Sequence, residues 1–337
     1  MSTGPATTQS FIDDLVRTTG ASSPEAAIRM KAQELIRLCE AIGPTQMPID
    51  VNMLTGMQGI YPSDDMPIQS PDAELTPRSD GHVEMRVHPD RPEMRKRFSI
   101  AHEISHTFFP EFQKRSWCRT DARYRDRKDP DQYLEMLCDI GAAELLFPNP
   151  WFGNDAKQVT EAAGLVALAE TYHGSREATL RRYAELSSDP IAAIYFTWKL
   201  KPKQKGVVDN EAQSNLLGIS HEDQVRDAMQ LRIDYVIGSE SFDSLGHFIP
   251  SDKSIKHIGP IFDSSSTASC CDGECHLDFG PASGTYAVMA IPLPTDRKQR
   301  GPNGEFSVAA IVRPVAVQNP KTKRSAIPED SPTLFDC

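Results

Sequence analysis

The sequence lacks any apolar run long enough to cross a bilayer, because no segment approaches the roughly 18 consecutive apolar residues that a membrane-spanning helix needs. It also lacks the apolar core of a secretory signal, since residues 1–10 are polar and Asp13 and Asp14 follow closely. Cysteine is scarce: the seven residues are scattered and odd in number, unlike the disulfide framework of a small secreted protein. These absences predict a soluble protein of a reducing cytoplasm, with no membrane partner.

Positive charge is in short supply as well. Asp and Glu number 47 against 36 Lys and Arg, so the net charge is −11. Nonspecific nucleic-acid binding needs basic surface that displaces counterions from phosphates, and this balance argues against direct contact with nucleic acid. An acidic surface suits a basic protein partner, although many proteins are acidic for solubility alone.

The length of 337 residues, with 39% apolar and 25% charged residues, fits a globular protein of one large or two ordinary domains. Apolar spacing predicts helices over residues 24–42, 48–60, 95–109, 130–147, 155–171 and 175–187. Asp80-Gly81 predicts a hairpin turn. After Pro190 the pattern changes to strands, over residues 191–200, 231–238, 285–293 and 306–317.

We therefore expect an α+β fold. Its parts are a flexible leader over residues 1–20, a domain with helices packed on a small antiparallel sheet over 21–190, a β-rich domain over 191–318, and a flexible tail over 319–337.

The most informative motif is HExxH at His102, Glu103 and His106. Histidines at i and i+4 lie one turn apart on one helix face, so both imidazoles can reach a single metal ion. The motif alone is suggestive, because short motifs also occur by chance. The alternative is a helix with two surface histidines beside a solvated glutamate.

The predicted helix over residues 130–147 offers a third ligand. It is apolar almost all round, yet Glu135, Asp139 and Glu144 interrupt it beyond the first turn. Buried carboxylates are costly unless they are paired or bound to metal. Glu135 and Asp139 share a face, and Glu144 points to the opposite side.

This geometry selects Glu135 as the ligand and Asp139 as the carboxylate that holds the other N–H of a ligand histidine. The alternative is that both carboxylates face solvent or pair with arginines of residues 111–128. Cys138 lies off their shared face, so we interpret it as a core residue.

A resemblance to a known family rests on three segments. Residues 95–109 read RKRFSIAHEISHTFF, and residues 135–148 read EMLCDIGAAELLFP. They resemble the RFTxAHExGH-like and Exx(A/C)NxxAAxLLxP-like helices of the ImmA/IrrE family of zinc metallopeptidases, and PIDVNMLTGMQGI at residues 48–60 resembles the segment that precedes them there. The similarity covers roughly residues 24–190. Ser105 stands where Gly is common, and Asp139 stands where Asn is common.

The resemblance implies a zincin-like catalytic domain. Zinc, or manganese in vitro, is then held by His102, His106 and Glu135, and Glu103 is the general base that takes a proton from the zinc-bound water attacking a peptide bond. Some members carry a further C-terminal domain, which implies a regulatory or sensor-like role for residues 191–318.

The substrate implied by the resemblance is a specific regulatory protein, such as a DNA-binding helix-turn-helix repressor cleaved in a stress response. The alternatives are a catalytically silent or regulatory binding protein of the same fold, a general cytoplasmic peptidase, and a metal-dependent hydrolase of a non-peptide bond.

Three further features have open interpretations. Tyr172 and His173 are candidate donors to the oxyanion, or else part of an ordinary turn between helices. The strand over residues 82–88 is a candidate edge for an extended substrate.

The third feature is a cysteine cluster. If Asp272-Gly273 forms a hairpin turn, Cys270 lies opposite Cys275. Such a pair could be a redox switch or, together with His276, a second metal site. The default interpretation is that all three cysteines, Cys271 included, are free and reduced.

Overall fold

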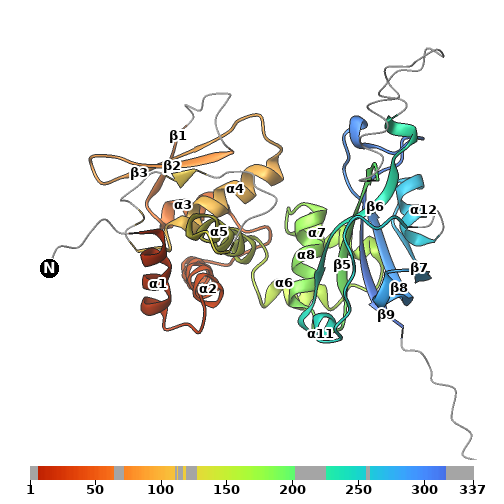
Figure 1. The fold of residues 1–337 in the computed structure, drawn as a ribbon. Coiled ribbons are helices and arrows are strands. Elements are labelled where there is room, and N and C mark those ends of the chain that lie inside the picture. Colours follow the sequence, from red (N-terminus) through yellow and green to blue (C-terminus); the bar gives the residue numbers. More distant parts are fainter. Residues whose placement is uncertain are drawn as a thin grey trace, which may run out of the picture.

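The computed structural model describes residues 7–63, 72–110, 112, 117–118, 127–201, 225–255 and 259–315. Over these ranges the chain is a mixed α and β protein with two separate sheets, as the sequence predicts (Figure 1). None of the helices in the described part of the chain is both long and apolar enough to cross a membrane. The predicted tail beyond residue 318 lies outside the described residues.

The N-terminal segment corrects one prediction. Helix α1 (Thr8–Thr19) begins after Thr7, whose side chain accepts a hydrogen bond from the Ser10 N–H. Its side chains Phe11, Ile12 and Leu15 are buried in the core. The prediction of a flexible leader is therefore wrong for these residues, because three apolar side chains at helical spacing bind α1 to the rest of the molecule.

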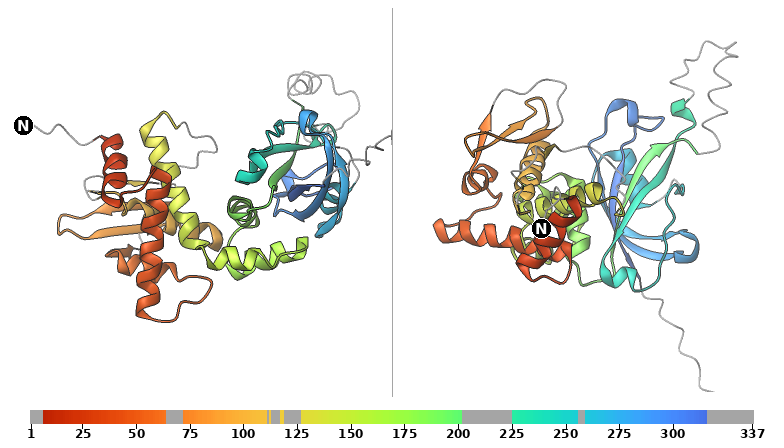
Figure 2. Two further views of the ribbon diagram at one scale, coloured as in Figure 1. Left: turned by 90° about the horizontal axis from the view of Figure 1, so that it is seen from below. Right: turned by 60° about the vertical axis from the view of Figure 1, so that its left-hand side comes forward.

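Four further helices and a sheet complete the first part of the fold. Helices α2 (Pro24–Ile42) and α5 (Pro130–Leu146) confirm the sequence prediction, each with a side-chain N-cap and a proline at its start. Helix α3 (Val51–Met57) is short, and α4 (Glu93–His106) carries the HExxH motif. Helix α5 packs between α2 and α4, which places the motif against a buried helix (Figures 1 and 2).

The first sheet has the strand order β1-β3-β2-β4, with β1 (Ile60–Ser63), β2 (Ala73–Pro77), β3 (Val83–Val87) and β4 (Trp117–Cys118). Strands β2 and β3 form the antiparallel hairpin predicted at Asp80-Gly81, where Gly81 has a φ of 88°. Strand β1 runs parallel to β3, so the sheet is not wholly antiparallel as expected. Helix α4 packs on β2 and β3.

Three helices then lead to the second sheet: α6 (Trp151–Ala156), α7 (Ala162–Thr171) and α8 (Arg176–Leu186). The prediction of a single helix over residues 155–171 is wrong, because the helical structure stops after α6 and starts again with α7. The start of α7 has a distant partner: the Ala162 N–H donates to the Asp272 carboxylate at 2.8 Å. Because the two residues are 110 positions apart in the sequence, the spacing of apolar residues near Ala162 could not predict this contact.

The second sheet is antiparallel, in the order β6-β5-β9-β8-β7. Its strands are β5 (Ala192–Lys199), β6 (Gln230–Gly238), β7 (Cys271–Leu277), β8 (Gly284–Pro292) and β9 (Val308–Pro314). Short helices are α11 (Glu240–Asp243), α12 (Pro260–Thr267) and the 3₁₀ turns Gly280–Ala282 and Arg297–Gln299. Alternate residues of β5 belong to two different cores, so α7 and α8 cover one face and α12 covers the other.

Strand β7 overturns the predicted cysteine hairpin. Asp272 and Gly273 lie within the strand, because β8 supplies partners along its whole length. Cys271 pairs with Ala290 and Cys275 with Tyr286, so Cys270 does not lie opposite Cys275. Five cysteines of the described residues are free thiols: Cys39, Cys138, Cys270, Cys271 and Cys275.

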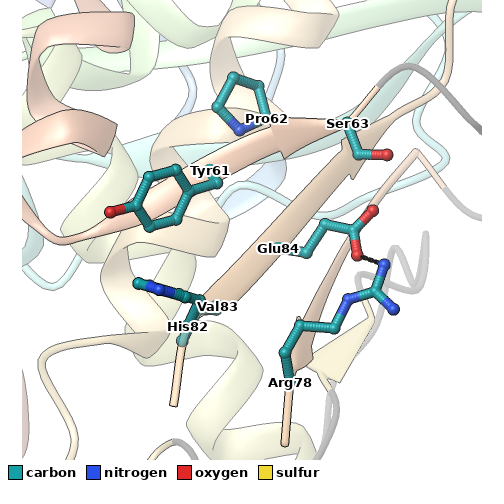
Figure 3. Close-up of a pocket in the computed structure, with 7 residues that line it drawn as sticks. All are labelled: Tyr61, Pro62, Ser63, Arg78, His82, Val83 and Glu84. Atoms are coloured by element: carbon teal, nitrogen blue, oxygen red, sulfur yellow. Dashed lines mark ion pairs between the residues drawn. The ribbon is translucent and has the colours of Figure 1, made fainter. Parts of the chain in front are cut away.

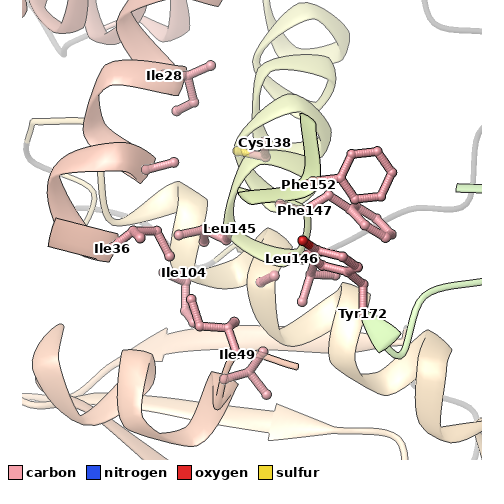
Figure 4. Close-up of a cluster of buried hydrophobic side chains, with 14 of the residues drawn as sticks. Ile28, Ile36, Ile49, Ile104, Cys138, Leu145, Leu146, Phe147, Phe152 and Tyr172 are labelled. Atoms are coloured by element: carbon pink, nitrogen blue, oxygen red, sulfur yellow. The ribbon is translucent and has the colours of Figure 1, made fainter. Parts of the chain in front are cut away.

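One buried core runs from α1 through α8 and onto a face of the second sheet, where Tyr195 and Ile311 belong to it. Figure 4 shows its central part, around α5. The boundary predicted near residue 190 falls between α8 and β5, two elements that pack on each other. Independent folding of the two predicted domains stays a prediction.

The third acidic residue of α5 has a buried ion-pair partner. Glu144 is bound by Arg182 of α8, and both side chains are only 2% exposed. The Arg182 Nε–H also donates to the Phe147 carbonyl at 3.2 Å, at the C-terminal end of α5. A buried charge that loses its partner is strongly destabilising, so this pair fixes α8 to α5.

Helices α4 and α5 approach closely where Ser105 faces Gly141. A Cβ atom at Gly141 would lie 2.5 Å from the Ser105 Oγ and 2.9 Å from its Cβ. The Ser105 hydroxyl donates to the Ala101 carbonyl at 2.8 Å, which keeps it in place. The distance between the two helices therefore depends on the absence of a side chain at Gly141.

Replacing Arg182 tests the buried pair. We expect Arg182→Met to lower the free energy of unfolding by about 3–5 kcal/mol, because it leaves the Glu144 charge buried without its cation. The double variant with Glu144→Leu should recover most of that loss. Urea denaturation measures both, and a loss below about 1 kcal/mol in Arg182→Met would show that the pair does not fix α8 to α5.

Enlarging Gly141 tests the helix contact. We expect Gly141→Ala to destabilise the fold by about 1–3 kcal/mol, because the new methyl group overlaps Ser105. In a Ser105→Gly background the same change should cost clearly less, since the overlapping atoms are gone. Equal costs in the two backgrounds, measured by denaturation, would mean that the two residues are not coupled.

Candidate metal centre

The HExxH residues occupy the last two turns of α4, the side of the helix that packs on α5. His102, Glu103 and His106 are all 0% exposed. The alternative of two surface histidines beside a solvated glutamate is therefore wrong. Three buried polar side chains within five residues are costly unless each has a polar or metal partner, so this segment of α4 has a specific role.

Glu135 of α5 lies between the two histidines. Its Oε2 is 3.2 Å from the Nε2 of His102, and its Oε1 is 3.4 Å from the Nε2 of His106. The centroids of the two imidazole rings are 5.0 Å apart. One carboxylate of α5 thus lies within 3.4 Å of an imidazole nitrogen of each histidine of α4.

Asp139 contacts the far side of the His102 ring. Its Oδ1 lies 2.8 Å from Nδ1, and its side chain is 37% exposed. Glu135 and Asp139 are one turn apart on α5, so one helix face supplies a group to each ring nitrogen of His102. Both carboxylates therefore contact the histidines of α4. The alternative pairing with arginines of residues 111–128 concerns Arg115, Arg119, Arg123 and Arg125, which lie outside the described residues.

The two carboxylates change the proton affinity of His102. Burial lowers the pKa of the ring, but the hydrogen bonds and negative charges of Asp139 and Glu135 outweigh it and raise the pKa to about 9. The pocket therefore stabilises a positive charge at this imidazole. A metal cation and a proton compete for the same Nε2 lone pair, so the same electrostatics favour a bound cation.

Cys138 adds a contact that the sequence did not reveal. It is fully buried, as its interpretation as a core residue requires, and its Sγ lies 3.3 Å from the Nδ1 of His106. Ligand atoms of His102, His106 and Cys138 all lie within 4.8 Å of one another, which makes these three a candidate metal-binding triad that does not include Glu135. The position of Cys138 next to Asp139 on α5 is the sequence feature from which this contact could have been predicted.

Glu135 and Cys138 are the two candidates for a third ligand beside the histidines, and they contact different atoms of the rings. Glu135 contacts the Nε2 atoms of both histidines, whereas the Cys138 sulfur contacts Nδ1 of His106. Two imidazole nitrogens and one carboxylate oxygen form a donor set that catalytic zinc uses in peptidases. The residues present therefore fit a zinc ion.

The candidate oxyanion donors have other surroundings. The Tyr172 hydroxyl donates to the Asp155 carboxylate at 2.7 Å, and its ring packs on Phe147 and Phe152 (Figure 4). Phe147 is the C-cap residue of α5 and lies eight residues beyond Asp139, about 12 Å along the helix axis. His173 is exposed in the turn after α7. The structure thus places Tyr172 in the core and gives neither residue a contact with the two histidines.

Strand β3 is not an edge strand, contrary to the prediction for residues 82–88. It lies between β1 and β2, and the edges of the described sheet belong to β1 and β4. A hollow of about 300 Å³ lies beside β1 and β3, where Tyr61 packs edge-on against His82 and Arg78 pairs with Glu84 (Figure 3). Its lining includes none of the HExxH residues or Glu135.

Comparison with known proteins gives one family and one structure. Residues 66–183 match the Peptidase_M78 family model, described as an IrrE N-terminal-like domain. No curated protein matches the chain. Among solved structures, a Mycobacterium tuberculosis transcriptional regulator is similar at 12% identity and a TM-score of 0.48, over 91% of this chain and 80% of the other.

The family match spans the HExxH motif and all of α5, and it is shorter than the similarity predicted over residues 24–190. It includes both histidines and the three residues that contact them: His102, His106, Glu135, Cys138 and Asp139. Over residues 66–183, the resemblance of this chain to the ImmA/IrrE family of metallopeptidases is confirmed.

Proposed function

We propose that this protein is a zinc-dependent endopeptidase with a zincin-like catalytic domain. The observation that carries the proposal is the Glu135 carboxylate, which contacts the Nε2 atoms of both HExxH histidines. The family match over the same segment supports it. In this proposal His102, His106 and Glu135 hold the zinc, and α1 belongs to the domain because its buried side chains join the same core.

The residues around the site have distinct tasks. Bound zinc would supply a Lewis acid that polarises a peptide carbonyl and lowers the pKa of a water molecule. Asp139 holds the His102 ring through Nδ1, which leaves Nε2 directed at Glu135.

Glu103 is the general base of the proposal. It follows His102 directly on α4 and is shielded from bulk water by full burial. Its carboxylate accepts a proton from the attacking water and donates it to the leaving amine. A protein that only binds its partner needs neither a glutamate at this position nor three convergent ligands, so the silent-binder alternative explains less.

The substrate we propose is a DNA-binding repressor protein, in a cytoplasmic setting. The family resemblance is the main support. The net charge of −11 also supports it, because an acidic protein attracts a basic protein partner and repels the phosphates of DNA. General peptide degradation is the alternative, and the two differ in whether cleavage is confined to one site.

The second sheet is proposed to be a regulatory or sensor-like domain over residues 191–318. The observation that supports this role is that α8 contacts both the second sheet and α5. The Tyr195 hydroxyl donates to the Glu177 carbonyl at 2.8 Å on one side of α8, while Arg182 binds α5 on the other. Helix α8 thus contacts both the sheet and the helix that carries Glu135.

A matched pair of substitutions on α5 tests the ligand set. Glu135→Gln should abolish stoichiometric zinc, because it removes the anionic ligand between the histidines. Glu144→Gln makes the same chemical change on the opposite face and should lower thermal stability while zinc stays bound. Elemental analysis of the purified proteins measures both, and a stoichiometric zinc in Glu135→Gln would refute the ligand assignment.

A cleavage assay tests the reaction and the substrate together. The purified zinc protein is incubated with repressors encoded near its gene, and with unfolded casein as a general substrate. We expect one discrete cut in a repressor, and a rate about 10²–10⁴-fold lower in Glu103→Gln, which removes the base and keeps the ligands.

Two outcomes of that assay count against the proposal. Casein digestion with no repressor cut would favour general peptide degradation. Repressor cleavage at an unchanged rate in Glu103→Gln would exclude Glu103 as the base, provided that this variant retains its zinc.

A further inference from the structure

The two histidines have different partners behind them. Consecutive residues of α5 contact their Nδ1 atoms: the Asp139 Oδ1 lies 2.8 Å from His102, and the Cys138 Sγ lies 3.3 Å from His106. The sulfur contact is within the reach of a hydrogen bond that involves sulfur. The Nε2 atoms of both rings point the other way, toward Glu135. Each ring is therefore held between one group on its Nδ1 side and Glu135 on its Nε2 side.

A ring that binds metal through Nε2 needs its orientation and tautomer fixed through Nδ1. A carboxylate does this for His102. For His106 the partner is the Cys138 sulfur, and a thiol is a weak donor and a weak acceptor. Glu103, Glu135 and Asp139 already bring three carboxylates to this site, and a fourth behind the fully buried His106 ring would add desolvation cost. A thiol orients the ring without that cost.

We propose that Cys138 is a positioning residue for the metal site: its sulfur holds the His106 ring so that Nε2 faces Glu135. The inference rests on the proposed zinc site and deepens it. Cys138 is not a ligand in this account, because its sulfur lies on the ring side opposite to the atom that faces Glu135.

The chain offers a matched control for the test. Cys39 of α2 is buried in the same core, at 2% exposure, and its Sγ contacts the Met57 Sδ at 3.2 Å. Removing either sulfur leaves a cavity of similar size in one core. Only removal of the Cys138 sulfur takes away a contact with a histidine.

The experiment measures the zinc dissociation constant of the full chain by competition with a chelator. Cys138→Ala should bind zinc about 10-fold more weakly, at the lower end of the usual effect of losing a group that orients a ligand. Cys39→Ala should match the wild type, and Cys138→Ser should bind more tightly than Cys138→Ala, because a hydroxyl again faces Nδ1. Equal binding in Cys138→Ala and wild type, or equal weakening in Cys138→Ala and Cys39→Ala, would overturn the inference.

A second measurement needs no variant. Cobalt(II) bound to the wild-type protein should show no thiolate-to-metal charge-transfer band in the near ultraviolet, and its presence would make Cys138 a ligand and overturn the positioning role. Failure of the wild type to bind any metal would instead refute the proposed zinc site itself. The two failures are therefore distinguishable.

Discussion

The contact of one carboxylate with two histidines of a neighbouring helix is the interaction on which the site depends. This contact requires the last two turns of α4 to pack closely on the first half of α5. The distance between the two helices is short because Ser105 faces Gly141, which has no side chain. With a wider gap, Glu135 would reach one imidazole and not both. The packing of two helices thus determines whether three polar side chains form a metal site or an unfavourable buried cluster.

Helix α5 shows how the fold accommodates polar groups in an apolar core. Glu135 and Asp139 face the histidines of α4, and Glu144 faces Arg182 of α8. Cys138, between the first two, contacts the second histidine. Each of these side chains has a polar partner on a neighbouring helix, so α5 links the proposed metal site on one side to α8 and the second sheet on the other.

Much of the site was predictable because its spacing is local. The i, i+4 relation of the histidines, and of Glu135 and Asp139, follows from helix geometry, and the costs of burying charge point to a common partner. Likewise the apolar spacing and N-caps gave α2 and α5 nearly to the residue. The contacts that escaped prediction join distant residues: Arg182 with Glu144, Asp272 with the start of α7, and strand β8 with the segment taken for a cysteine hairpin. The sequence predicts a flexible leader over residues 1–20 because an isolated amphipathic helix such as α1 gives no sign of what it packs against.

The most direct test of the account is X-ray absorption at the zinc edge of the purified full chain. It counts the atoms bound to zinc and separates sulfur from nitrogen and oxygen by bond length. With Glu135 as the third ligand, we expect two imidazoles and only nitrogen or oxygen ligands, at about 2.0–2.2 Å. A sulfur ligand at about 2.3 Å would contradict it, because Cys138 would then take the place assigned to Glu135.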